Sequence, residues 1–128
     1  MILSSAPNIL TYQSCAPQVV HNPGTVPDPQ YLAFADSTVI FEATYETFKE
    51  RNGAGMLSNI LDAGRSQRCC IIHSVPDNVT GHEFLRLVKD ATKIADEVFI
   101  THLTQDYYQS FDRRWAEFVD LMASSSAR

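Results

Sequence analysis

Four short runs of apolar residues recur along the chain, and within each run the apolar positions are nearly continuous rather than alternating with polar ones. Runs of this length that are rich in β-branched and aromatic residues favour strands over helices. Continuous apolar character is typical of strands covered on both faces, as in parallel sheets. The predicted strands cover residues 18–22, 38–42, 68–74 and 97–102.

Segments with helical punctuation or helical spacing of apolar residues lie between and after these runs. An aspartate followed by proline at 28–29 predicts the start of a short helix, and residues 56–61 carry a second apolar helical face. A capping box predicts a helix over residues 80–94, and apolar residues at helical spacing over 111–122 predict a last amphipathic helix. The stretch 45–55 is interrupted by glycines and carries no clear prediction.

Strand followed by helix, four times over, predicts an α/β fold of (βα)₄ order, with parallel strands joined by right-handed helical crossovers. The chain shows no sequence repeat and no internal domain boundary. We assign residues 1–17 to a leader, 18–125 to the domain and 126–128 to a short tail.

The 128 residues are 45% hydrophobic and 20% charged, which is the composition of one ordinary globular domain. The formal net charge is −5 and the basic residues are scattered, so neither nucleic acid nor an anionic membrane is an expected partner. Pro7 interrupts the N-terminal apolar run and no basic residue precedes it, so no signal peptide is predicted. An odd number of cysteines argues against a disulfide framework, and Cys69 and Cys70 are predicted to be buried thiols.

Polar groups stand at the carboxyl end of every predicted strand, where α/β sheets bind their ligands. Glu42 is the sharpest candidate, because partial desolvation at the rim of an apolar sheet would suit its carboxylate to acid–base work. A solvated glutamate at a loop is the alternative. His73 is a candidate substrate contact or a structural histidine, and Thr101 and His102 are weaker candidates of the same kind.

Asn22 is placed by a turn whose residues each have a mechanical role. Pro23 fixes its own φ, Gly24 permits a positive φ, and Asn22 is left projecting at the end of its strand. No His-x-x-x-His or Cys-x-x-Cys spacing, Gly-x-Ser-x-Gly elbow or glycine-rich phosphate loop occurs, so neither a metal site nor a cofactor is predicted.

Several motifs of the chain also occur together, in this order, in one protein family. The most specific are Asn22-Pro-Gly-Thr25 and Phe41-Glu42, and the others are Val19-Val-His21, Val26-Pro-Asp28, Tyr31-Leu32, Ala35-Asp-Ser-Thr-Val-Ile40, Tyr45, Ile71-Ile-His73, Phe99-Ile-Thr101 and Tyr107-Tyr108. From about residue 18 to about residue 122 the chain resembles the spherulation-specific family 4 (spherulin 4-like) proteins, and its motifs correspond to the C-terminal half of the family.

The resemblance implies the (βα)₄ half of a TIM barrel from a glycoside hydrolase. Characterised relatives are secreted or surface-exposed enzymes that cut α-1,4-linked galactosamine polymers internally, with or without N-acetyl groups. A polysaccharide is therefore the expected ligand, and no cofactor is expected.

The family's acidic site combines an Asp-Glu pair at the end of an earlier strand with the glutamate of the Phe-Glu motif, and only the latter carries over, onto Glu42. Asp96-Glu97 is the only adjacent acidic pair of the chain, but it precedes its strand and so belongs to the opposite end of the sheet. Glycoside hydrolysis ordinarily needs two carboxyl groups. We therefore expect an inactive or weakly active chain, with Asn22, His73, Thr101 and His102 as substrate contacts.

Two other functions stay open. The chain could be a non-catalytic carbohydrate-binding or interaction module of the same fold, or a partial gene product with no independent function. Half a barrel would also leave two strand edges and an apolar sheet face without partners, with Val20, Ile40 and Ile72 as candidate exposed residues. This predicts self-association through the open half-barrel.

Overall fold

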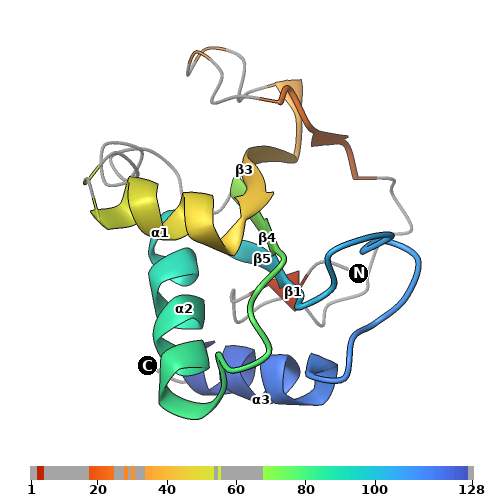
Figure 1. The fold of residues 1–128 in the computed structure, drawn as a ribbon. Coiled ribbons are helices and arrows are strands. Elements are labelled where there is room, and N and C mark those ends of the chain that lie inside the picture. The colour runs from red at the N-terminus through yellow and green to blue at the C-terminus, as the bar shows by residue number, and fades with distance from the viewer. Residues whose placement is uncertain are drawn as a thin grey trace.

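The structure is a computed structural model that describes residues 3–4, 18–24, 28, 30, 34–53, 55 and 68–126. These residues form a five-stranded sheet with helices packed against it (Figure 1). The strands are β1 (Leu3–Ser4), β2 (Val20–His21), β3 (Ser37–Thr44), β4 (Arg68–His73) and β5 (Glu97–Ile100). The helices are α1 (Tyr45–Gly53), α2 (Gly81–Ile94) and α3 (Trp115–Ser126).

The sheet has the order β1-β5-β4-β3-β2, so the last four strands lie beside one another in sequence order. All pairings among β2, β3, β4 and β5 are parallel. Each of the four predicted strands is present, and the predicted α/β fold with helices between parallel strands is confirmed. No helix among the described residues combines the length and the apolar character that a membrane crossing requires.

The outer edge of β5 has a partner, contrary to the prediction of two free strand edges. β1 pairs with β5 in antiparallel register, with Leu3 opposite Val98 and Ser4 opposite Glu97. This partner comes from the residues that were assigned to the leader. Self-association of the chain stays a prediction.

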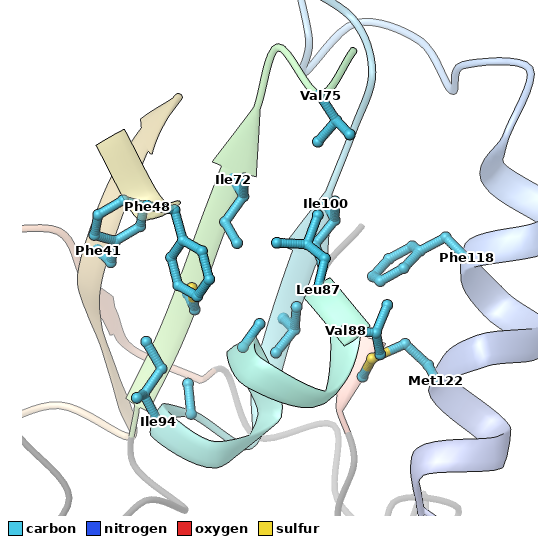
Figure 2. Close-up of a cluster of buried hydrophobic side chains, with 14 of the residues drawn as sticks. Phe41, Phe48, Ile72, Val75, Leu87, Val88, Ile94, Ile100, Phe118 and Met122 are labelled. Carbon is cyan, nitrogen blue, oxygen red and sulfur yellow. The ribbon is translucent and has the colours of Figure 1, made fainter. Parts of the chain in front are cut away.

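One large hydrophobic cluster fills the space between the sheet and the helices (Figure 2). The predicted apolar face of α2 faces this cluster, and Phe84 and Val88 are fully buried in it. Phe118 and Met122 of α3 pack against the same side chains, as the helical spacing predicts. All three helices contribute buried residues here, so they cover the same face of the sheet. The prediction over 111–122 is wrong for Phe111, which precedes the helix and is 55% exposed, and for Val119, which is 38% exposed.

The prediction that Ile40 and Ile72 are exposed is wrong. Their side chains are 4% and 0% exposed and belong to the helix-side cluster. Along β4, side chains alternate between faces, which turns Ile72 toward the helices and Ile71 away from them. Ile71 is also only 4% exposed, and of the three predicted residues Val20 alone is exposed, at 46%.

The N-terminus of α2 is capped differently from the prediction. Thr80 has an extended backbone and forms no side-chain capping bond, so the predicted capping box with Glu83 is absent. Instead, the backbone N–H of Gly81 donates to the carboxylate of Glu117 in α3 at 2.9 Å. A carboxylate at this position compensates the positive end of the helix dipole as a local cap would, and it also ties α2 to α3.

The remaining elements differ from the sequence prediction mainly in their ends. α1 occupies the stretch without a clear prediction, and its first turn is capped by Thr44, whose hydroxyl accepts a hydrogen bond from the backbone N–H of Thr47 at 3.2 Å. The helix predicted at 56–61 lies outside the described residues. Most of the helix predicted from 28–29 also lies outside them, although the Asp28 carboxylate accepts a hydrogen bond from the backbone N–H of Gln30, as an N-cap does.

Cys69 and Cys70 are both free and fully buried, as predicted. Burial raises the pKa of the Cys69 thiol to about 12, and the negative charges of Glu97 and Glu42 add to the shift. A thiol in this state is a poor nucleophile, so Cys69 serves the packing of the sheet.

Candidate functional site

A β-bulge in β3 decides where Glu42 points. The register between β3 and β4 shifts between Val39 and Phe41, so Ile40 is an extra residue in its strand. Ile40 and Phe41 consequently both lie in the helix-side cluster, and Glu42 pairs with Ile71 on the opposite face. An uninterrupted strand would turn Glu42 toward the helices. The bulge therefore directs the carboxylate onto the opposite face of the sheet, which carries a second buried cluster of Val39, Cys69, Ile71 and Phe99.

Two neutral donors hold the Glu42 carboxylate, one at each oxygen. The side-chain amide of Asn22 donates to Oε2 at 2.6 Å, and the hydroxyl of Tyr108 donates to Oε1. Both carboxylate oxygens thus act as hydrogen-bond acceptors. Partial burial raises the pKa of Tyr108, and the hydrogen bond to Glu42 raises it further, so the phenol keeps its proton and remains a donor.

The turn after β2 positions Asn22 as predicted. Gly24 has a φ of +76°, and its backbone N–H donates to the Asn22 side-chain oxygen at 3.3 Å. Because that oxygen is occupied, the amide nitrogen of Asn22 is the group that faces Glu42. A cavity of about 200 Å³ adjoins this pair and is lined by Asn22, Gly24, Val39, Ile40, Phe41, Glu42, Ala43 and Arg51.

His73 ends β4 on the same face as Ile71 and therefore on the same face as Glu42. Its ring stacks on Tyr107 with centroids 4.3 Å apart and planes at 7°. Tyr107 in turn meets Tyr108 edge to face at 4.8 Å. A continuous series of rings thus runs from His73 to the hydrogen bond on Glu42.

Burial lowers the pKa of His73, and the negative charge of Glu42 offsets part of this shift. The folded chain consequently favours the neutral imidazole, whereas the unfolded chain takes up a proton at higher pH. Stability should therefore fall as the pH is lowered from about 7 to about 5. We expect a smaller fall in melting temperature for His73→Asn than for the wild type. The exposed His82 of α2 supplies the matched control, and equal pH dependence in His73→Asn and His82→Asn would contradict the assignment.

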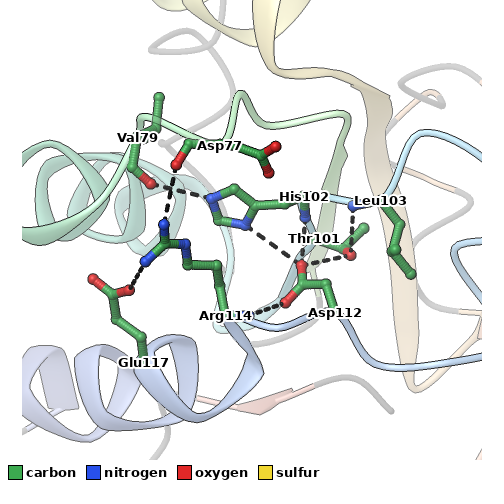
Figure 3. Close-up of polar contacts among 8 residues, drawn as sticks. All are labelled: Asp77, Val79, Thr101, His102, Leu103, Asp112, Arg114 and Glu117. Carbon is green, nitrogen blue, oxygen red and sulfur yellow. Dashed lines mark hydrogen bonds and ion pairs between the residues drawn. The ribbon is translucent and has the colours of Figure 1, made fainter.

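Thr101 and His102 lie in a separate network that is built around Asp112 (Figure 3). One Asp112 oxygen accepts from the Thr101 hydroxyl at 2.9 Å and from the backbone N–H of His102 at 2.5 Å. The His102 ring donates through Nε2 to the carbonyl of Val79 at 3.1 Å, and its Nδ1 lies 3.4 Å from the same Asp112 oxygen. Thr101 is 2% and His102 8% exposed, so this network is buried.

The structure therefore brings Asn22 and Glu42 into direct contact and places His73 one strand away. It gives Thr101 and His102 protein partners of their own, and their role as substrate contacts stays a prediction. Tyr107 and Tyr108 belong to the site, but the strand-end argument does not reach them because they lie in the loop after β5. A pair of adjacent tyrosines after a strand that ends in polar residues is the sequence signal that points to them.

The chemistry of the site is that of one carboxylate among neutral donors and aromatic rings. Asp96 and Glu97 stand at the amino end of β5, away from Glu42, as the sequence predicts. Within the described residues, no second carboxylate is hydrogen-bonded or ion-paired to Glu42, Asn22 or Tyr108. The same residues contain no group of three or more histidine, cysteine or acidic side chains that could hold a metal ion.

Comparison with known proteins identifies relatives of this chain. A crystal structure of Aspergillus clavatus Sph3 in complex with GalNAc is similar, with a TM-score of 0.78 and 56% sequence identity. The similarity covers 84% of this chain and 44% of that chain, so the chain spans less than half the length of this relative. Among curated proteins, none matches the chain.

The family comparison extends over almost the whole chain. The model of spherulation-specific family 4 matches residues 5–122 and so begins within the segment assigned to the leader. Together with the structural similarity, this match confirms the resemblance seen in the Asn22-Pro-Gly-Thr25 and Phe41-Glu42 motifs. The chain belongs to spherulation-specific family 4.

Proposed function

We propose that the chain is a (βα)₄ half-barrel of the glycoside hydrolase type that binds N-acetylgalactosamine or galactosamine units at Glu42 and has little turnover of its own. The observation that carries the proposal is the Glu42 carboxylate, held between Asn22 and Tyr108 at the carboxyl end of the parallel strands. The 56% identity to a protein that was solved with GalNAc supports this class of ligand.

The donors and acceptors of the site suit a sugar. Sugar hydroxyls both donate and accept hydrogen bonds, and Glu42, Asn22 and His73 offer acceptors and donors on one face of the sheet. The stacked rings of His73 and Tyr107 offer an apolar surface for the face of a pyranose. Sites of this kind combine an apolar wall with a few well-placed polar groups.

Glu42 is the group that would take part in glycosidic bond cleavage. Its charge would stabilise the oxocarbenium-like transition state, or its oxygen would act as acid, base or nucleophile. The choice depends on the distance to a second carboxyl group, which ranges from about 5 Å to about 9.5 Å between the two mechanisms. Because Glu42 has no carboxylate partner among the described residues, we assign it no single role.

Binding of N-acetylgalactosamine tests the proposal directly. At ~0.3 kcal/mol for each of the sugar's roughly 15 non-hydrogen atoms, the expected dissociation constant is on the order of 1 mM. Asn22→Ala removes the donor that orients Glu42 and should weaken binding about ten-fold, as measured by calorimetry or by NMR titration. Asn52→Ala, on the exposed surface of α1, should leave it unchanged. The proposal fails if the wild type shows no saturable binding at roughly ten times the expected constant.

A non-catalytic binding module is the second candidate, and turnover separates the two. Both candidates predict binding, but only the hydrolase type predicts slow release of reducing ends from an α-1,4-linked galactosamine polymer. The Glu42 carboxylate can accept hydrogen bonds from sugar hydroxyls in either case, so the release of reducing ends is the measurement that separates the two.

A further inference from the structure

Phe111 is a large apolar side chain that the fold leaves 55% exposed. Its ring stacks on Trp115, with centroids 4.4 Å apart and planes at 22°. Trp115 in turn packs against the fully buried Phe118 and against Phe99. Stacking on an anchored ring fixes the orientation of the Phe111 side chain. A ligand that binds its exposed surface therefore costs little side-chain conformational entropy.

Two cavities meet at Phe111. The smaller, of about 170 Å³, is lined by Phe99, Tyr107, Tyr108, Gln109, Ser110 and Phe111. The larger, of about 470 Å³, is lined by Asp77, His102, Leu103, Phe111, Asp112, Arg113 and Arg114. Tyr108 lines the smaller cavity and also donates a hydrogen bond to Glu42, so the two cavities follow one another from the candidate site past Phe111.

The larger cavity lies at the carboxyl edge of the sheet. Its lining comes from the loop after β4 and the loop after β5, which leave the same carboxyl edge as Glu42. Its walls are fixed by the network in Figure 3, in which Arg114 donates to the backbone carbonyl of Asp77 at 3.2 Å and lies 3.5 Å from the carboxylate of Glu117. The cavity is therefore formed before any ligand arrives, which lowers the cost of binding.

The groups left available in this cavity match a sugar unit. Asp77 and Arg113 are exposed, and no described residue engages the carboxylate of the first or the guanidinium of the second. The carboxylate can accept and the guanidinium can donate hydrogen bonds to hydroxyls, and the Phe111 ring can receive an apolar pyranose face. A wholly apolar ligand would leave both charges unpaired, and because the two available charges are of opposite sign, the cavity favours a neutral hydroxyl-bearing ligand over an anion or a cation.

We infer that this cavity is a second sugar subsite, so that an oligosaccharide bound at Glu42 continues along Tyr108 and across Phe111 to Asp77 and Arg113. The inference rests on the proposed function and adds to it the direction in which the polymer runs. It also implies a ligand of several sugar units rather than a single one.

Phe111→Ala tests the subsite with a short α-1,4-linked N-acetylgalactosamine oligosaccharide as the probe and the monosaccharide as its reference. The wild type should bind the oligosaccharide at least about ten-fold more tightly than the monosaccharide. Phe111→Ala should remove about ten-fold of the oligosaccharide affinity and leave the affinity for the monosaccharide unchanged. Asp77→Asn, a surface change that keeps the side-chain shape, should act in the same direction.

Phe34→Ala is the matched control, because Phe34 is 75% exposed but precedes β3 at the amino edge of the sheet. This variant should bind both ligands like the wild type. Equal affinity of the wild type for monosaccharide and oligosaccharide, or an oligosaccharide affinity that survives Phe111→Ala, would overturn the subsite and leave the proposed function standing. Conversely, oligosaccharide binding that depends on Phe111 without any monosaccharide binding would support the subsite and refute the site at Glu42. If neither ligand binds, both fail.

Discussion

Replacement of Asp112 by alanine is expected to lower the free energy of unfolding by about 3 kcal/mol, from the loss of several charge-assisted hydrogen bonds at a buried carboxylate. One Asp112 oxygen holds the Thr101 hydroxyl and the backbone N–H of His102, and the other accepts from the backbone N–H of Arg114 at 2.7 Å. Alanine would leave these donors without an acceptor in a place where water has little access.

The position of Asp112 makes this cost hard to avoid by relaxation. The residue lies just before α3, and its carboxylate satisfies one of the free N–H groups at the start of that helix. At the same time it fixes the end of β5 through Thr101 and His102. A shift that restored one set of bonds would break the other.

Thermal unfolding checks this prediction, with an expected fall in melting temperature of about 10 °C. Asp120→Ala, an exposed position of α3, removes the same charge without the network and should change stability by less than about 0.5 kcal/mol. Similar melting temperatures for the two variants would show that the Asp112 network contributes little to stability.

The four parallel strands could be predicted because each is encoded by its own short run of apolar residues. A strand that is covered on both faces carries apolar residues at successive positions, so a continuous apolar run identifies it. The apolar face of α2, with Phe84 and Val88 in the core, follows from helical spacing in the same way. The turn at Asn22 was predictable because the positive φ of Gly24 is a property of that residue alone.

What the sequence left open depends on contacts between distant residues. The capping box at Thr80 is a local pattern, but the carboxylate that caps α2 is Glu117, 36 positions from Gly81. Tyr108 lies 66 positions from Glu42, and nothing near either residue specifies the other. The bulge at Ile40 is invisible in an apolar run, yet it reverses the face of every residue after it, Glu42 included.

Replacement of Glu42 by glutamine is expected to weaken binding of N-acetylgalactosamine by between about ten-fold and about a hundred-fold. The range follows from the loss of a charge-assisted hydrogen bond to a sugar hydroxyl, worth about 1.5–3 kcal/mol. Any slow cleavage of a galactosamine polymer should disappear with it, because an amide can neither take up a proton from water nor stabilise an oxocarbenium-like transition state.

The hydrogen bonds around Glu42 make glutamine a clean replacement. Asn22 must present its amide nitrogen, since its oxygen accepts from Gly24. The glutamine oxygen therefore faces Asn22 and its nitrogen faces Tyr108, whose hydroxyl oxygen can accept a hydrogen bond instead of donating one. All three side chains keep their places, so the melting temperature should stay within about 2 °C of the wild type.

Calorimetric titration of the two proteins with the monosaccharide measures the effect. Glu46→Gln, an exposed carboxylate in the first turn of α1, removes the same charge four residues away and should bind like the wild type. Unchanged affinity in Glu42→Gln, with the fold intact, would show that the sugar does not contact this carboxylate. The ligand would then have to be placed elsewhere on the carboxyl edge of the sheet, where His73 and the rings of Tyr107 and Phe111 remain.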